Sequence, residues 1–245
     1  MNHTIRELLD RKSVRSYTDR EISQRARRVI LNAAMAAPTA GNQQMYTILD
    51  IQDPALKQKL SVLCDNQPFI ARGKMVLVFC ADYRKWYDTF TEAGAEPRDP
   101  AAGDLMLAVT DTCIAAQNAV VAAQSLGIGS CYIGDVMEQY AQMKACLHLP
   151  QYVFPCAMLV FGYPTRQQRL RKKPERCALS DIVCVDTYAR KSGEDLRRMF
   201  AKKHGDTSFD QWARAFCERK YNSEFSREMS KSVEQYLKEY GSAAE

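Results

Sequence analysis

The amino-acid sequence predicts an α+β fold, in which helices cover a central sheet. Helical patterns outnumber strand patterns along the 245 residues, and the two do not alternate regularly. The run KMVLVFCAD at 74–82 is apolar almost throughout, which is typical of a strand covered on both faces. We expect a main domain over residues 1–185. A helical extension over 186–245 should pack on that domain or on a dimer partner, since the chain becomes more polar and charged there.

The first half of the chain predicts four elements before the apolar strand. Residues 3–10 predict a helix, because Ile5, Leu8 and Leu9 share one face. The other three are a helix over 22–36 that Pro38 ends, a strand over 45–52 and a short helix over 54–63.

The second half begins with YRKWYDTFTEAGAEPRDPAAG, which starts as a helix and ends as a loop. This segment, 84–102, is either a lid over a ligand or a peripheral helix with buried aromatic residues. Next come the longest helix over 104–126, ended by Gly127, a short helix near 138–147 and a strand over 153–163. Two further helical stretches, DQWARAFCER and SREMSKSVEQYLKEY, lie in the extension.

The composition is that of a soluble, well-packed protein, with 46% hydrophobic and 26% charged residues. A net charge of +5 is too weak and too dispersed to indicate nucleic-acid binding. The apolar 104–126 helix carries Thr110, Asp111, Gln117 and Asn118, which would be costly in lipid, so we expect a buried helix and no membrane span.

The nine cysteines include no CxxC pair, and none of the three histidines lies near a pair of cysteines. A zinc site or an iron–sulfur cluster needs closer ligand spacing, so we expect no metal site. Free thiols in apolar runs indicate a reducing compartment, and the polar N-terminus has no hydrophobic signal core. We therefore expect a cytoplasmic protein.

The stretch RKSVRSY follows the first helix and concentrates positive charge. If the backbone is extended there, Arg11, Ser13 and Arg15 point to the same side. Two guanidinium groups with a hydroxyl between them suit a phosphate dianion. The alternative is a solvated basic turn.

Three further stretches could bind a ligand, and each has a plain structural alternative. The basic run TRQQRLRKKPER (165–176) follows a strand end and is either an anion site or a solubilising loop. The glycines of GIGSCYIG (127–134) permit close approach to a flat ligand or a simple turn. The amides of APTAGNQQ (37–44) could read a heterocycle or merely fill a polar loop.

The motifs of common hydrolases and nucleotide-binding enzymes are absent from the sequence. It has no GxSxG, no HExxH and no GxxxxGK[ST]. A protein rich in Arg, Ser, Asn and Gln at its candidate sites, without a clear acid, base or nucleophile, favours chemistry carried out by a bound cofactor.

Taken in order, these stretches resemble the nitroreductase family of FMN flavoproteins. The resemblance rests on RKSVRSY, AAPTAGNQQ, DNQPFIARGKMVLVFCAD, SLGIGSCYIGDV and VFGYPTRQQRLRKKPER, which span residues 5 to about 180. The C-terminal part resembles the larger, NADPH-preferring branch. The resemblance implies a mixed sheet flanked by helices and an intertwined homodimer with FMN at the subunit interface. It also implies two-electron, ping-pong reduction of nitroaromatics, quinones or free flavins by NADPH or NADH.

The resemblance also implies the residues that contact FMN. They are Arg11, Lys12, Ser13 and Arg15 at the phosphate and ribityl chain, Thr39, Asn42 and Gln67 near the ring, Tyr132, Ile133, Gly134 and Asp135 past its N5 edge, and Lys173 and Arg176 at the phosphate. No catalytic side chain is implied, because the reaction takes place at flavin N5 with the backbone of Gly134 nearby. Candidates for the NADPH 2′-phosphate, by charge alone, are Arg197, Arg198, Lys202 and Lys203.

The chain departs from the family pattern in two places: Met45 and Tyr46 follow Gln44 where proline and an aromatic are usual, and the spacing from Lys173 to Arg176 is one residue longer. Two other classes of function remain open. One is a flavoenzyme of the same fold that reduces enones or removes halide reductively. The other is a non-enzymatic anion-binding protein.

Overall fold

The computed structural model describes residues 1–241. Its internal contacts divide the chain into two compact units. The first unit runs from Met1 to Arg171 and takes up the chain again from Glu228, and the second is Lys172–Arg227. The boundary expected after residue 185 falls inside the second unit.

Four strands form the sheet of the first unit: β1 (Tyr46–Ile51), β2 (Met75–Asp82), β3 (Gly129–Ile133) and β4 (Val153–Gly162). They lie in the order β1-β2-β4-β3, and all three pairings are antiparallel. The α+β class is confirmed, but the expectation of a mixed sheet is corrected. Among the described residues, parallel pairing is confined to one bridge between Ser13 and Ser130. A strand covered on both faces has the same apolar pattern in either direction, so the sequence does not reveal strand direction.

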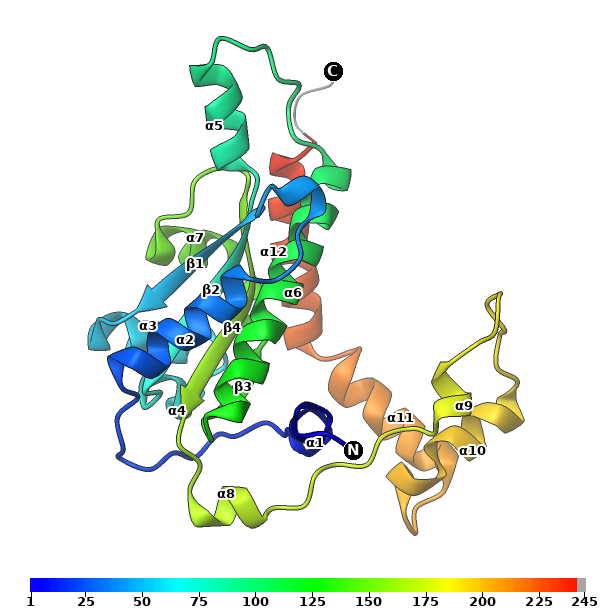
Figure 1. Ribbon diagram of the computed structural model, residues 1–245. Coiled ribbons are helices and arrows are strands. Elements are labelled where there is room, and N and C mark those ends of the chain that lie inside the picture. Colours follow the sequence, from blue (N-terminus) through cyan, green and yellow to red (C-terminus); the bar gives the residue numbers. More distant parts are fainter. Residues whose placement is uncertain (242–245) are drawn as a thin grey trace. The chain divides into compact units, whose positions relative to one another are not determined.

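Helices cover both faces of this sheet (Figure 1). Val76, Val78 and Cys80 of β2 face α3 (Pro54–Leu63), α4 (Pro68–Ala71) and α7 (Tyr140–Leu147). The alternate residues Met75, Leu77 and Phe79 face α2 (Gln24–Met35) and α6 (Ala102–Ser125). Every residue of β2 is buried, as its apolar run predicts.

Short elements complete the first unit. They are α1 (His3–Asp10), α5 (Arg84–Glu92), α8 (Arg166–Leu170) and the 3-10 turns η1 (Ala40–Asn42) and η2 (Asp135–Met137). Gly127 has a φ of 70° just after α6, as expected of the glycine that follows a helix end.

The last helix, α12 (Glu224–Glu239), anchors its C-terminal half on the first unit. Tyr236 is buried. Its ring centroid lies 4.6 Å from that of Tyr140 and 5.0 Å from that of Phe154. Tyr240 lies 5.4 Å from the Tyr152 ring and donates to the Tyr152 carbonyl at 2.6 Å. These edge-on aromatic contacts fix the chain end beside β4.

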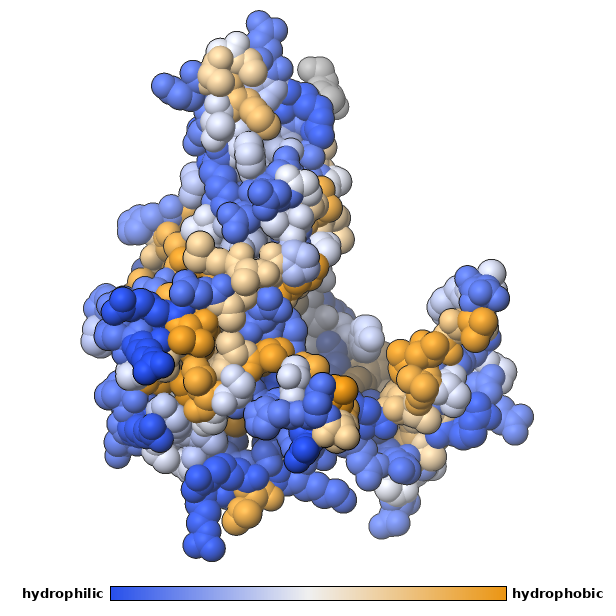
Figure 2. Space-filling view, in the orientation of Figure 1, coloured by the Kyte–Doolittle hydropathy of each residue, from blue (hydrophilic) through white to orange (hydrophobic). Residues whose placement is uncertain are grey.

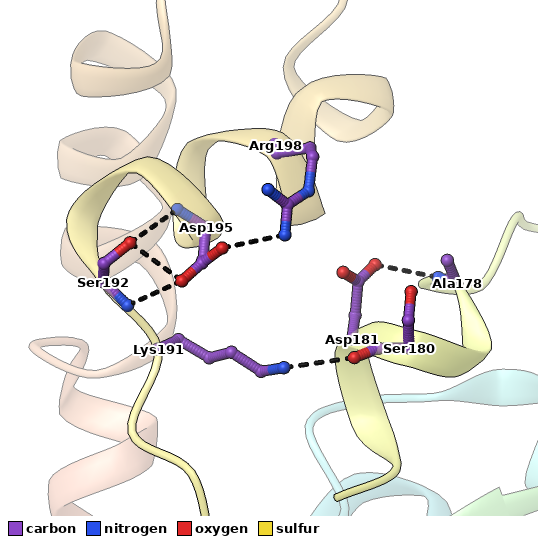
Figure 3. Close-up of polar contacts among 7 residues, drawn as sticks. All are labelled: Ala178, Ser180, Asp181, Lys191, Ser192, Asp195 and Arg198. Carbon is purple, nitrogen blue, oxygen red and sulfur yellow. Dashed lines mark hydrogen bonds and ion pairs between the residues drawn. The ribbon is translucent and has the colours of Figure 1, made fainter.

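The second unit contains α9 (Leu179–Ile182), α10 (Gly193–His204) and α11 (Phe209–Lys220). Trp212 of α11 packs 5.5 Å from the rings of both Phe200 and Phe216. At the start of α10 the Ser192 hydroxyl accepts from the Asp195 N–H, and Asp195 accepts from the Ser192 N–H (Figure 3). This capping box explains why α10 begins there.

The first unit exposes an apolar face. Figure 2 shows apolar surface in the region of α1, α2 and α6. The exposed large side chains there include Ile5, Leu8 and Leu9 of α1 and Met106, Leu107 and Ile114 of α6. Within residues 1–241, α6 alone has the length and hydropathy of a membrane-crossing helix, a test that core helices also pass, and its other side packs on the sheet.

Candidate functional site

The cationic stretch after α1 lies against β3. The Val14 N–H donates to the Ser130 carbonyl at 2.9 Å, next to the parallel bridge between Ser13 and Ser130. A Cβ at Gly129 would lie 2.6 Å from the Val14 side chain. Only glycine permits this approach, so the sequence fixes the stretch on the edge of the sheet.

Arg11, Ser13 and Arg15 all act on one buried thiol, that of Cys131. Burial raises the pKa of Cys131, and the Arg15 charge together with hydrogen bonds from Ser13 and Arg15 opposes that rise. Arg11 acts on the same thiol in the same direction. The prediction that the three side chains share one side of an extended backbone agrees with this arrangement. The Arg15 guanidinium also lies 6.0 Å from the Phe69 ring.

Arg11 carries an unsatisfied donor at this site. Its Nη1 atom is buried, and it has no hydrogen-bond partner among residues 1–241. Unpaired buried donors are rare in proteins, and a buried cationic donor is especially costly without an acceptor. An anion bound beside this donor would supply the missing acceptor.

Lys12 points away from this group. Its Nζ donates to the Arg169 carbonyl at 2.7 Å and to the Arg171 carbonyl. Arg171 in turn donates to the Ser13 carbonyl at 2.6 Å, and Gln168 accepts from the Arg15 N–H at 3.3 Å. The end of α8 thus clamps the cationic stretch, a role of Arg171 and Gln168 that sequence reasoning missed.

Lys173 and Arg176 belong to the second unit. Their expected place at a phosphate stays a prediction. The one indication of Arg171 in the sequence was the positive charge of the 165–176 run. That charge did not distinguish Arg171 from its basic neighbours.

Gln67 and Asp135 meet on the α4 side of the sheet. Gln67, at the N-cap of α4, donates to the Cys64 carbonyl at 2.9 Å and to the Asp135 carboxylate. Phe69 lies in α4, two residues after Gln67, and the Arg15 guanidinium lies over the Phe69 ring. The Gln67–Asp135 pair is therefore near the cationic stretch. Gly134 lies directly before η2, as its N-cap residue.

Tyr132 and Ile133 point to opposite sides of β3, as neighbours in a strand do. Ile133 is buried in the core on the α4 side, so only its backbone is available to a ligand. The Tyr132 hydroxyl donates to Gln117 of α6 at 3.3 Å, and burial raises its pKa.

Thr39 and Asn42 lie in the segment between α2 and β1. The Thr39 hydroxyl donates to Asp111 of α6, and Asn42 lies exposed at the tip of η1. The structure therefore brings together Arg11, Ser13 and Arg15, and separately Gln67 with Asp135, while Thr39 is held by α6 and Asn42 is exposed.

A buried carboxyl group, that of Glu138, lies near Asp135. Glu138 is 2% exposed, and its Oε1 has no partner in the described part of the chain. Burial raises the pKa of Glu138 to about 8, and the charges of Asp135, Asp65 and Glu228 add to the effect. At neutral pH this carboxyl therefore holds its proton. No motif in the sequence indicated it.

The second unit has its own basic cavity of about 830 Å³. Its lining includes Arg176, Arg198, Lys202, Lys203, Trp212 and Phe216. Arg198 pairs with Asp195 at 2.8 Å (Figure 3), and Lys202 lies 3.5 Å from Glu175. These pairs are largely exposed, so an incoming anion displaces them at little cost.

The match of a family model agrees with the site. The model described as Nitroreductase family matches residues 8–163. An FMN reductase [NAD(P)H] of Bacillus subtilis is 30% identical over 238 residues, covering 96% of this chain and 91% of the relative. An oxygen-insensitive NADPH nitroreductase of Salmonella typhimurium is 32% identical over 220 residues, covering 87% and 89%.

A solved structure extends the likeness to the fold. The NfrA1 nitroreductase from B. subtilis superposes with a TM-score of 0.83 at 27% sequence identity. The match covers 98% of both chains, so it includes the segments beyond residue 163.

Proposed function

Because this chain belongs to the nitroreductase family, we propose that it binds FMN and reduces small oxidised acceptors with NAD(P)H. The acceptors are nitroaromatics, quinones or free flavins, reduced by two electrons in a ping-pong cycle. The observation that carries this proposal is the buried, unpartnered Nη1 of Arg11 beside Ser13 and Arg15. It supports an anion site where the FMN phosphate is expected.

The residues present suit the phosphate of FMN. Arg11 and Arg15 supply two guanidinium groups, and Ser13 supplies a hydroxyl between them. Charge-assisted hydrogen bonds of this kind are short and strong. Lys12 and Arg171 support the site by joining the cationic stretch to the end of α8. Lys12 donates to the Arg169 carbonyl, and Arg171 donates to the Ser13 carbonyl.

The flavin ring is expected beside Gln67 and Gly134. Bound FMN supplies the hydride transfer itself. The protein's part is to orient the ring, and we expect the backbone N–H of Gly134, the residue directly before η2, to donate to its N5 edge. Asp135 fixes the orientation of Gln67. No side-chain acid or base is required at this edge.

We propose a homodimer formed through the apolar face of α1 and α6. Exposed patches of this kind mark protein–protein contacts. Met106 is 62% exposed and Leu9 is 56% exposed, although both are large apolar residues. In such a dimer the 39–44 loop of one protomer contacts FMN at the subunit interface. Size-exclusion chromatography with light scattering tests the dimer, and a monomer in solution contradicts it.

The basic cavity of the second unit is a candidate for the phosphorylated end of NADPH. It combines cations with the Trp212 and Phe216 rings, which suits an anionic nucleotide. The test compares the rate of NADPH oxidation with the rate of NADH oxidation at the same concentration. It is made for the wild type and for Lys203→Ala. Loss of the NADPH preference supports it, and an unchanged preference contradicts it. The free cysteine thiols support a cytoplasmic location.

The visible spectrum tests the main proposal. The purified protein should show flavin bands, NADPH should bleach them without oxygen, and a nitroaromatic or a quinone should restore them. Arg15→Ala should weaken FMN about tenfold to a hundredfold, through loss of a charge-assisted bond worth about 1.5–3 kcal/mol. A colourless protein that takes up no FMN contradicts the proposal. Rates on nitro compounds, quinones, enones and organohalides separate the nitroreductase reaction from enone reduction and dehalogenation.

A further inference from the structure

The loop from Thr39 to Gln44, between α2 and β1, has a backbone that needs support. Gly41, Asn42 and Gln44 have positive φ values of 56°, 56° and 50°. Glycine takes this conformation freely and asparagine readily, but glutamine adopts it uncommonly. Contacts at the base of the loop must therefore hold the exposed tip in shape.

Asp111 of α6 supplies one set of contacts. It is 3% exposed, and its Oδ1 accepts from the Ala40 N–H at 3.1 Å. Its Oδ2 accepts from the Thr39 hydroxyl, and the Thr39 oxygen accepts from the Gln44 N–H at 2.8 Å. A hydroxyl has one proton. Thr39 directs that proton to Asp111 and has none left for a ligand.

Trp86 of α5 holds the loop from another side. Its indole Nε1–H donates to the Gln43 carbonyl at 2.8 Å. The neighbouring Lys85 donates to the Tyr46 carbonyl at 2.7 Å, just past the loop, and burial lowers the pKa of Lys85. Helices α5 and α6 thus both bond to a segment that has little secondary structure of its own.

Asn42 is what the loop presents. This residue is exposed, so its side-chain amide is accessible to a ligand. An amide offers both donors and an acceptor, as the edge of a heterocycle requires. The bonds from Asp111 and Trp86 end on the backbone beside it.

We propose that Asp111 and Trp86 are positioning residues for cofactor binding, which lock the 39–44 loop so that the Asn42 amide meets the flavin in one orientation. Thr39 links Asp111 to the loop backbone and is not itself a ligand. The inference rests on the proposed function, because it takes FMN as the molecule that Asn42 contacts.

A double-mutant cycle on FMN affinity tests the inference, with fluorescence titration of the FMN-free protein as the readout. Asp111→Asn puts a donor where an acceptor is needed and should weaken FMN about tenfold. Asn42→Ala should cost a similar factor. The double variant should bind FMN no more weakly than the single variant with the lower affinity, because a displaced loop no longer presents Asn42. Additive losses overturn the inference.

Thr112→Val is the matched control. Thr112 follows Asp111 on α6 and is buried. Its hydroxyl bonds to the Ala108 carbonyl of the same helix and to the Cys156 thiol, and neither partner belongs to the 39–44 loop. This variant should leave FMN affinity unchanged, even where it lowers the melting temperature. A loss of affinity equal to that of Asp111→Asn would show that α6 stability alone matters, and it overturns the proposed role.

Thr39 and Trp86 keep the test decisive if Asp111→Asn does not fold. Thr39→Ser retains the hydroxyl and should keep wild-type affinity and the visible circular dichroism of bound FMN, while Thr39→Val should lose both. Trp86→Phe should speed hydrogen exchange at residues 39–44. Equal behaviour of the two Thr39 variants, or unchanged exchange in Trp86→Phe, overturns the inference. A wild-type protein without FMN uptake overturns the proposed function first, so the two failures are distinguishable.

Discussion

The side-chain amide of Gln67 donates to the carboxylate of Asp135, and this bond joins the start of α4 to η2. The same nitrogen also donates to the Cys64 carbonyl at 2.9 Å. Because both amide protons are used inside the protein, the Gln67 oxygen is the atom that can accept from a ligand. If FMN binds beside Gln67 as proposed, we expect Asp135 to act on the flavin through Gln67.

This relationship predicts a difference between two substitutions at Asp135. Asp135→Ala removes the acceptor and frees Gln67, so FMN affinity should fall about twofold to tenfold, the effect of one ordinary hydrogen bond. Asp135→Asn keeps an acceptor oxygen and should change affinity little. Fluorescence titration with FMN measures both. Equal losses in the two variants would show that the charge matters and that the hydrogen bond does not.

Close packing at Gly129 gives a second prediction. In Gly129→Ala the new Cβ would lie 2.6 Å from the Val14 side chain and push the cationic stretch off β3. We expect lower FMN affinity and a lower melting temperature. Gly103→Ala is the control, because a Cβ there meets open space at the start of α6. It should be neutral or stabilise by about 0.5–1 kcal/mol. Wild-type FMN affinity in Gly129→Ala would contradict the fixed position of the stretch.

The sequence predicted most of the long elements because their patterns are strong. The apolar run was sufficient to predict β2, and the amphipathic pattern was sufficient to predict α1. It did not predict β3, because Gly129–Ile133 is a short edge strand with polar Ser130 and a glycine start. It also did not predict α10, whose charged sequence has no buried residue.

The candidate site divides in the same way. The cationic stretch was predictable, because alternation along an extended backbone places Arg11, Ser13 and Arg15 together. The roles of Asp111 and Trp86 were not, since they depend on contacts with residues 72 and 43 positions away in the sequence. Pairings of this kind appear only once the fold has brought distant elements together.

The buried Glu138 predicts a pH-dependent stability. Its pKa is about 8 in the folded protein, against an ordinary value of 4.5, because of burial and the nearby Asp135, Asp65 and Glu228 charges. Between these two values the folded state holds a proton that the unfolded state releases. The free energy of unfolding should therefore decrease as pH rises through this window. The stabilising contribution is complete below the lower value and lost above the upper one.

Glu138→Gln should remove this dependence, because glutamine resembles the protonated carboxyl and does not titrate. Urea unfolding at about pH 5 and about pH 8 should show a smaller difference in the variant than in the wild type. Glu92→Gln, at an exposed position of α5, is the control and should keep the wild-type difference. An unchanged pH dependence in Glu138→Gln would mean that other groups cause it.

Two buried tyrosines of the C-terminal segment should respond differently to loss of their hydroxyls. The Tyr240 hydroxyl donates to the Tyr152 carbonyl at 2.6 Å, so Tyr240→Phe should lower the free energy of unfolding by about 1 kcal/mol. The Tyr236 hydroxyl is buried without a partner in the described residues, so Tyr236→Phe removes an unsatisfied group and should be neutral or stabilising. Both variants keep the ring contacts with Tyr152 and Phe154. Urea unfolding measures each change, and a larger loss in Tyr236→Phe than in Tyr240→Phe would contradict this account of the α12 anchor.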